Sequence, residues 1–278
     1  MRILHIARWC CIRTLKQVIS QQEAGWDVTL MAASTGHPDL HAMVSKAIGW
    51  QTQAAMRGLI SAYDVIVVHT TIATHDDAID IPYAIGPTAK QLVWDCHDFV
   101  STQPRILYDA IVVPSKGYAD KLGAKATVVY SKVPECLLPE VSGDRMLYHE
   151  CIALNATLCA SEPWGNYSDI QSINEHCPVY IYPSGDDISG HEHLNVMRRL
   201  PYRQLLQKLT HYPRHWCGSA NADVSIHDCV TNKFWECLAC ESKPLFRNSD
   251  EMQELYDNCY DIPTMEQEFP AMKEAYGL

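Results

Sequence analysis

Residues 61–70 read SAYDVIVVHT, and a run of β-branched residues fills the middle of this stretch, at 64–68. A run that is apolar on both faces is typical of a strand buried in a parallel sheet. Five other runs in the first half have this character, at residues 2–7, 27–31, 91–94, 110–113 and 126–130. The segments between them suit helices, at 13–23, 41–47, 74–81 and 116–122. This alternation predicts a doubly wound α/β domain.

The same alternation restarts after residues 133–144, which read VPECLLPEVSGD and are typical of a linker. The second half predicts strands at 151–155, 178–182 and 243–246, and helices at 167–176, 202–211, 232–240 and 250–257. The tail from residue 265 predicts a closing helix, which Pro270 would break. We therefore expect two Rossmann-like domains facing across a cleft, at residues 1–140 and 145–262, and a closing segment at 263–278.

Composition narrows the classes of protein. Of 278 residues, 47% are apolar and 20% charged, which excludes a disordered chain or a coiled-coil array. The 22 basic and 33 acidic residues give a net charge of −11, which disfavours a general nucleic-acid binder. No apolar run approaches the roughly 18 residues of a membrane span, and the start does not read as a signal peptide. We expect a cytoplasmic protein without stable membrane insertion.

One of the cysteine spacings invites a metal interpretation. Cys237 and Cys240 are separated by two residues, as in many zinc sites. Both also fall in the expected helix at 232–240, where positions three apart share one face. A second ligand pair with this spacing is absent from the sequence, so we expect core packing and no metal.

Six segments, in this order and spacing, resemble the GT-B glycosyltransferases, close to the retaining enzymes of family 4. They read RILHIA (2–7), SAYDVIVVHT (61–70), VWDCHDF (93–99), AIVVPSKGYADKLG (110–123), VTNKFWECLACESKPLF (230–246) and DEMQELY (250–256). The resemblance implies the GT-B fold and transfer of a hexosyl or pentosyl group from a nucleoside diphosphate sugar to a hydroxyl acceptor. Retention of anomeric configuration, with no metal and no cofactor, is also implied by the resemblance alone.

The helix expected at 232–240 suits the donor. Its first-turn N–H groups and positive dipole end can bind a diphosphate, with Thr231 as N-cap and Asn232 and Lys233 beside the phosphates. The resemblance implies that Glu236 binds the ribose hydroxyls, and that Asp228, eight residues earlier, is a second acid of the site. The alternative interpretation is a surface helix with ordinary charges.

Three residues follow predicted strands, at the edge where ligands of doubly wound sheets bind. His97 and Asp98 follow QLVWDC, and His69 ends the run VVH. The resemblance implies that His97 contacts the donor sugar, and we place Asp98 with it as a catalytic candidate. His69 would line the acceptor side. The alternative is an ordinary loop histidine, because the chain has 13 histidines.

The acceptor is open between a small molecule, a glycan and modified DNA. The donor-helix residues also resemble phage-type DNA glycosyltransferases, which would act on 5-hydroxymethylated cytosine in the cytoplasm of the host cell. Residues 197–215 carry the basic residues for such a contact, and Arg198, Arg199, Arg203 and Arg214 could contact phosphates. A solvated face of an amphipathic helix is the simpler explanation of these basic residues.

Departures from the family pattern keep two other functions open. The stretch after the first strand, ARWCCIR at 7–13, lacks glycine, and residues 156–169 lack the Arg/Lys pair expected there. Glu241 stands where a glycine is expected. A non-catalytic relative that binds a nucleotide sugar, or a sugar-nucleotide epimerase, would tolerate these changes.

Overall fold

The computed structural model divides the chain into two compact units. Unit 1 comprises Met1–Cys136 together with Thr264–Leu278, and unit 2 comprises Leu137–Pro263. The described residues are 1–71, 74–88, 90–97, 104–123, 125–141, 152–156, 177–183, 195–219, 230–247 and 249–278.

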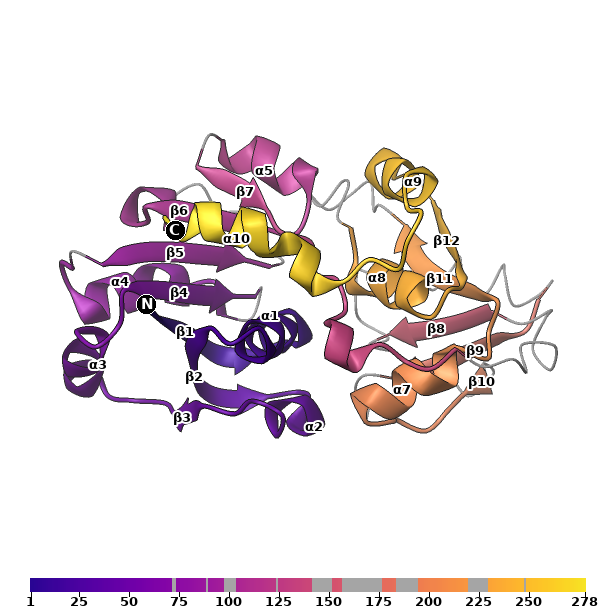
Figure 1. Cartoon of the computed structure of the whole chain (residues 1–278), viewed down its shortest axis with the longest axis horizontal. Helices are drawn as coiled ribbons and strands as arrows, with labels where there is room; N and C mark the ends of the chain where they lie inside the picture. Colours follow the sequence, from indigo (N-terminus) through magenta and orange to yellow (C-terminus); the bar gives the residue numbers. More distant parts are fainter. Residues whose placement is uncertain are drawn as a thin grey trace. The chain divides into compact units, whose positions relative to one another are not determined.

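Unit 1 is built on a seven-stranded parallel sheet with the order β3-β2-β1-β4-β5-β6-β7 (Figure 1). The strands are β1 (Arg2–Cys10), β2 (Asp27–Thr35), β3 (Ala47–Gly49), β4 (Val65–Thr70), β5 (Gln91–Cys96), β6 (Ala110–Val113) and β7 (Ala126–Val128). All six predicted strands of the first half are present. Every residue of β4 is buried, as its continuous apolar run requires in the middle of a sheet.

The helices of unit 1 agree less closely with prediction. They are α1 (Ile12–Glu23), α2 (Pro38–His41), α3 (Gln53–Ile60), α4 (Asp77–Ile85) and α5 (Lys116–Leu122). The helix predicted at 41–47 is wrong: α2 ends at His41, and residues 47–49 pair with β2 as the short strand β3. Helix α3 was not predicted, although Thr52 caps it by accepting a hydrogen bond from the Ala55 backbone N–H.

The C-terminus returns to unit 1. A 3-10 turn, η5 (Met265–Glu268), leads into α10 (Phe269–Ala275), drawn in yellow among the N-terminal elements in Figure 1. Pro270 lies in the first turn of α10, where a missing N–H costs little, and the tail changes from a 3-10 helix to an α-helix just before it, close to the predicted break.

Unit 2 holds a five-stranded parallel sheet with the order β10-β9-β8-β11-β12. Its strands are β8 (Ile152–Ala156), β9 (Val179–Pro183), β10 (Asn195–Val196), β11 (Arg214–Ser219) and β12 (Lys243–Arg247). Its helices are α7 (Tyr202–Leu209), α8 (Asn232–Ala239) and α9 (Asp250–Asp257). The three predicted strands are present, β10 and β11 were not predicted, and the helix expected at 167–176 lies outside the described residues.

Both units therefore have the parallel α/β architecture that the alternating pattern predicted. Across the described parts of the two units, no helix combines the length and apolarity that a membrane crossing requires.

Candidate functional site

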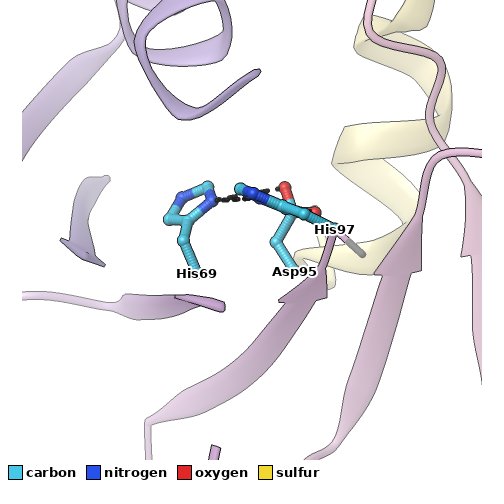
Figure 2. Close-up of side chains that lie close together, drawn as sticks. All are labelled: His69, Asp95 and His97. Atoms are coloured by element: carbon cyan, nitrogen blue, oxygen red, sulfur yellow. Dashed lines mark hydrogen bonds and ion pairs between the residues drawn. The ribbon is translucent and has the colours of Figure 1, made fainter. Parts of the chain in front are cut away.

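Three ionisable side chains meet at the carboxyl end of the unit 1 sheet. Strands β4 and β5 pair in parallel with His69 opposite Asp95, and His97 follows β5 directly. Because side chains alternate across a strand, Asp95 and His97 lie on the same face of the sheet. Figure 2 shows the three groups converging from the two strand ends.

These three side chains are within hydrogen-bonding or ion-pair distance of one another. His69 Nδ1 lies 3.2 Å from His97 Nε2 and 3.4 Å from Asp95 Oδ2, and His97 Nε2 lies 3.3 Å from Asp95 Oδ1. All three are almost fully buried. Buried polar groups are costly unless they are paired, so this arrangement needs partners from other elements.

Helix α1 supplies those partners from one of its faces. Arg13 Nε donates to Asp95 Oδ1 at 3.0 Å, and Gln17 Nε2 donates to Asp95 Oδ2 at 2.7 Å. One turn further on, Gln21 Oε1 lies 2.9 Å from His5 Nε2. The spacing of four residues places all three side chains on the face that covers the sheet.

The hydrogen-bond partners decide which ring nitrogen of each histidine carries a proton. Gln21 Nε2 donates to the Tyr276 hydroxyl at 3.3 Å, so Gln21 Oε1 accepts from His5 Nε2–H. Burial lowers the pKa of His5 to about 4, so this ring is neutral and its Nδ1 accepts from His69 Nε2, at 2.7 Å. Burial also lowers the pKa of His69 well below its ordinary value, which leaves His69 Nδ1 as an acceptor for His97 Nε2–H.

His97 differs from the other two histidines because anionic groups face it. Burial alone would lower the pKa of His97, but Cys11 and Asp95 raise it to about 10. Burial alone would raise the pKa of Asp95, but Arg13 and His97 hold it well below its usual range. The buried cluster of His69, His97, Asp95 and Arg13 therefore holds a protonated imidazole and a guanidinium around one carboxylate.

The same three groups satisfy the distance requirement for a metal site. One ligand atom from each of His69, Asp95 and His97 lies within 4.8 Å of the others. Arg13 and Gln17 already bond both oxygens of Asp95, so a cation would have to compete with a guanidinium. We therefore interpret the group as an internal ion cluster rather than a metal centre.

The predicted donor helix is present as α8 in unit 2. Thr231 is its N-cap and accepts a hydrogen bond from the Phe234 N–H, at 3.4 Å. Thr231, Asn232 and Lys233 are half-buried around the first turn. Glu236 is buried one turn later and accepts a hydrogen bond from the Tyr202 hydroxyl, at 3.0 Å. Asp228, like Asp98 in unit 1, lies outside the described residues.

The basic residues of 197–215 do not share one helix. Arg198 and Arg199 precede α7, Arg203 lies in its first turn, and all three are exposed. Arg214 begins β11 and is half-buried, with Nη2 3.5 Å from Cys177 Sγ. Arg214 is therefore less accessible to solvent than the other three arginines.

Cys237 and Cys240 are both buried, in and just after α8. Cys237 Sγ donates to the Ser242 carbonyl at 3.2 Å, and Cys240 Sγ donates to the Leu206 carbonyl at 3.5 Å. Burial, with the neighbouring thiol of Cys217, raises the pKa of Cys237 well above its ordinary value. A protonated thiol suits core packing, because zinc needs the thiolate.

A hollow of about 620 Å³ also opens on unit 1. Its lining includes Arg8, Trp50, Asp80 and Tyr83, from the end of β1, the loop before α3, and α4. The Arg8 guanidinium lies 5.1 Å above the Trp50 ring and is ion-paired with Asp77. An aromatic ring beside hydrogen-bonding side chains can bind a sugar or another polar ring compound.

Five residues that bond to or lie beside His69 and His97 in this buried cluster were not predicted as site residues. They are His5, Cys11, Arg13, Gln17 and Asp95. A usable signal was present, because Arg13, Gln17 and Gln21 repeat every four residues in a predicted helix. His5 and Asp95 likewise interrupt otherwise apolar strands. Polar side chains in predicted core positions therefore mark a buried network.

Comparisons with known proteins place this fold beside the folds of solved glycosyltransferases. No protein-family model matches the chain, and no curated protein matches it. Among solved structures, an alpha-glucosyltransferase in complex with UDP and a 13-mer DNA containing an HMU base is 14% identical, with a TM-score of 0.62. That match covers 100% of this chain and 91% of the other.

Two further solved structures agree with this placement. Anabaena Alr3699/HepE, in complex with UDP-glucose, has a TM-score of 0.66 at 12% identity and covers 92% of this chain and 82% of its own. A sucrose-phosphate synthase from Thermosynechococcus elongatus has a TM-score of 0.60 at 8% identity and covers 99% and 95%. The chain therefore has the GT-B fold, as the sequence predicted.

Proposed function

We propose that this protein is a glycosyltransferase that moves a sugar from a nucleoside diphosphate donor to a hydroxyl acceptor, with retention of configuration. The observation that carries the proposal is the first turn of α8. Thr231 caps the helix, and Asn232 and Lys233 lie half-buried beside its positive end. A diphosphate leaving group gains negative charge during transfer, which this end of the helix would stabilise.

Glu236 is the proposed partner of the donor ribose, together with Asp228. Its carboxylate lies one turn inside α8 and is held by the Tyr202 hydroxyl. A carboxylate fixed in this way can accept hydrogen bonds from two adjacent hydroxyls. The solved neighbours with UDP or UDP-glucose support a nucleotide donor of this class.

His97 and Asp98 are the proposed catalytic residues near the transferred sugar. His97 lies at the carboxyl end of β5, where ligands of parallel sheets bind. Its Nδ1 faces Cys11 Sγ at 2.9 Å. A sugar hydroxyl would therefore compete with the Cys11 thiol for this nitrogen.

The acceptor belongs to unit 1 in this proposal. The hollow beside Trp50 provides an aromatic face and hydrogen-bonding groups for a hydroxylated molecule. His69 remains the proposed acceptor-side residue and would act through His97, because it is buried and both of its ring nitrogens bond to other histidines. The neighbour solved with DNA that contains an HMU base supports modified DNA as a second class of acceptor. Within this class we propose 5-hydroxymethylated cytosine, with Arg198, Arg199, Arg203 and Arg214 as phosphate contacts.

The donor site is tested with Glu236→Gln, which keeps a side chain of similar shape and an acceptor oxygen for Tyr202. We expect the affinity for UDP-sugars, measured by calorimetry, to fall by about 10- to 100-fold, because hydrogen bonds to a charged group are the strong ones. Tyr202→Phe is the complementary control, since it removes the internal hydrogen bond that Glu236→Gln can retain and leaves the carboxylate in place. Equal affinities of the wild type and Glu236→Gln would exclude Glu236 from the site.

Catalysis is tested separately, because residues 156–169 carry no Arg/Lys pair to neutralise the diphosphate. A panel of nucleotide sugars is first scored by thermal shift, since a ligand that binds only the folded state raises its stability. The ligands that bind are then assayed for nucleotide release, with and without hydroxyl acceptors. Binding without release from any donor would identify a non-catalytic nucleotide-sugar-binding protein instead.

A further inference from the structure

A second chemical group in unit 1 is the thiol of Cys11. Cys11 follows β1 directly and is the N-cap residue of the twelve-residue helix α1. Its side chain is half-buried, and its Sγ lies 2.9 Å from His97 Nδ1 and 3.8 Å from Thr14 Oγ1. The sulfur thus lies at the positive end of a helix and in contact with an imidazole.

The cluster orients His97 for this contact. His97 Nε2–H points to His69 Nδ1 and Asp95 Oδ1, at 3.2 and 3.3 Å. His97 Nδ1 is therefore the nitrogen that faces the sulfur and can take its proton. Thiol, imidazole and carboxylate then stand in sequence, which is the arrangement that activates a cysteine as a nucleophile.

The charges around the thiol favour its thiolate form. The groups that face the pair of Cys11 and His97 are Asp95, Arg13 and the neutral His69, and Cys10 is the neighbouring buried thiol. With Cys11 as thiolate and His97 protonated, two positive charges balance two negative ones. Burial raises the pKa of Cys10, with Cys11 contributing, so its thiol stays protonated and is the natural internal contrast.

We propose that Cys11 is a thiol-modification site whose thiolate, held by His97 and Asp95, reacts with low-molecular-weight disulfides and other soft electrophiles. The thiolate attacks one sulfur of the disulfide, a new S–S bond forms at Cys11, and the original S–S bond breaks. The second sulfur leaves as a thiolate and takes a proton from water, while excess free thiol reverses the exchange. This reactivity does not depend on the proposed sugar transfer.

The test follows iodoacetamide alkylation of the intact chain between pH 5.5 and 9. Cleavage after Arg8 and Arg13 gives the peptide WCCIR, and Cys136, exposed in the 3-10 helix η3 (Glu135–Leu137), lies in a separate peptide. Between pH 8 and pH 6 we expect the rate at Cys11 to change less than about threefold. The alkylation rate of an ordinary thiol with a pKa near 8.5 falls nearly 100-fold over this range, and the exposed Cys136 is the comparison within the same chain.

Three variants assign the reaction. Cys10→Ala should keep the fast labelling of WCCIR and Cys11→Ser should abolish it. His97→Gln should move the pH profile of Cys11 to that of Cys136, and oxidised glutathione should form a mixed disulfide at Cys11 ahead of Cys136 in the wild type. A wild-type Cys11 profile that follows Cys136 overturns the proposal, and this measurement does not require any variant to fold.

Discussion

At the residue scale, a neutral and a protonated histidine meet at the ends of β4 and β5, where His69 Nδ1 lies 3.2 Å from His97 Nε2. The pKa of His69 is lowered by burial, and the other histidines and Arg13 oppose the attraction of Asp95, whereas Cys11 and Asp95 raise the pKa of His97. Burial sets the cost in both cases, and the neighbouring anions decide which ring carries the proton.

Because His5 is neutral in the folded protein, the free energy of unfolding should decrease in acid. His5 has a folded-state pKa of about 4 and an unfolded value near 6.5. Between these values the unfolded chain binds a proton that the folded chain does not, so stability falls as the pH falls from 6.5 to 4. We expect His5 to account for about 3 kcal/mol of this loss, from 1.36 kcal/mol per pKa unit.

The measurement is urea unfolding at pH 4.5, 5.5, 6.5 and 7.5, on the wild type and on His5→Gln. The variant should show a weaker loss of stability between pH 6.5 and 4.5, even if it is less stable at every pH. His75→Gln is the comparison, because it makes the same substitution at an exposed position. A wild-type stability that stays constant from pH 6.5 to 4.5 would contradict the neutral assignment of His5.

At the element scale, the end of α8 has a backbone conformation that favours glycine, although a glutamate stands there. Glu241, which stands where a glycine was expected, has a φ of 51°. Its N–H bonds to the Leu238 carbonyl, and the Ser242 N–H bonds to the Cys237 carbonyl, which is the Schellman arrangement of a helix end. A side chain at this left-handed position is strained relative to glycine.

Glu241→Gly should therefore stabilise the protein, by about 1 kcal/mol, because the left-handed conformation costs a non-glycine residue roughly 1–2 kcal/mol and glycine returns part of this as chain entropy. Glu241→Ala is the matched control and should bring no such gain, because alanine keeps the Cβ that causes the strain. Thermal melts of the three proteins measure the difference. Equal melting temperatures for the Gly and Ala variants would show that the backbone at 241 relaxes without cost.

The elements that could be predicted are those with a strong local signal. Buried strands such as β4 are continuous apolar runs, and all nine predicted strands are present. Strands β3 and β10 have only three and two residues and carry no run, and β11 reads RHWCGS, which mixes charged and small residues. These three strands form because neighbouring strands offer hydrogen-bonding edges, and a local pattern does not contain that information.

At the scale of the whole molecule, the fold could be predicted from the sequence, but the buried polar cluster around Asp95 could not. His69 and His97 could be placed at strand ends, but Arg13 and Gln17 meet Asp95 only because their side chains extend from α1 to the end of β5. A helical pattern shows that these side chains share a face, and only the sheet order β1-β4-β5 shows what that face covers.

The net charge of −11 decides how DNA could be bound as an acceptor. Of the four arginines proposed as phosphate contacts, Arg214 is half-buried, so the salt dependence is estimated from the three exposed ones, Arg198, Arg199 and Arg203. Each phosphate contact contributes about −0.9 to the slope of log affinity against log salt, so we expect a slope of about −3. Binding to a duplex with 5-hydroxymethylated cytosine should therefore be measurable at 50 mM salt and much weaker at 200 mM.

The double variant Arg198→Ala/Arg199→Ala tests this assignment, because removing two of three contacts should reduce the slope to about −1. Arg105→Ala is the matched control, since Arg105 is an exposed arginine of unit 1 and should leave the slope unchanged. Titrations across the salt range, with modified and plain duplexes, give both slopes. A slope near −3 that the double variant preserves would place the phosphates elsewhere, and no measurable binding at 50 mM salt would leave small hydroxyl acceptors as the substrates.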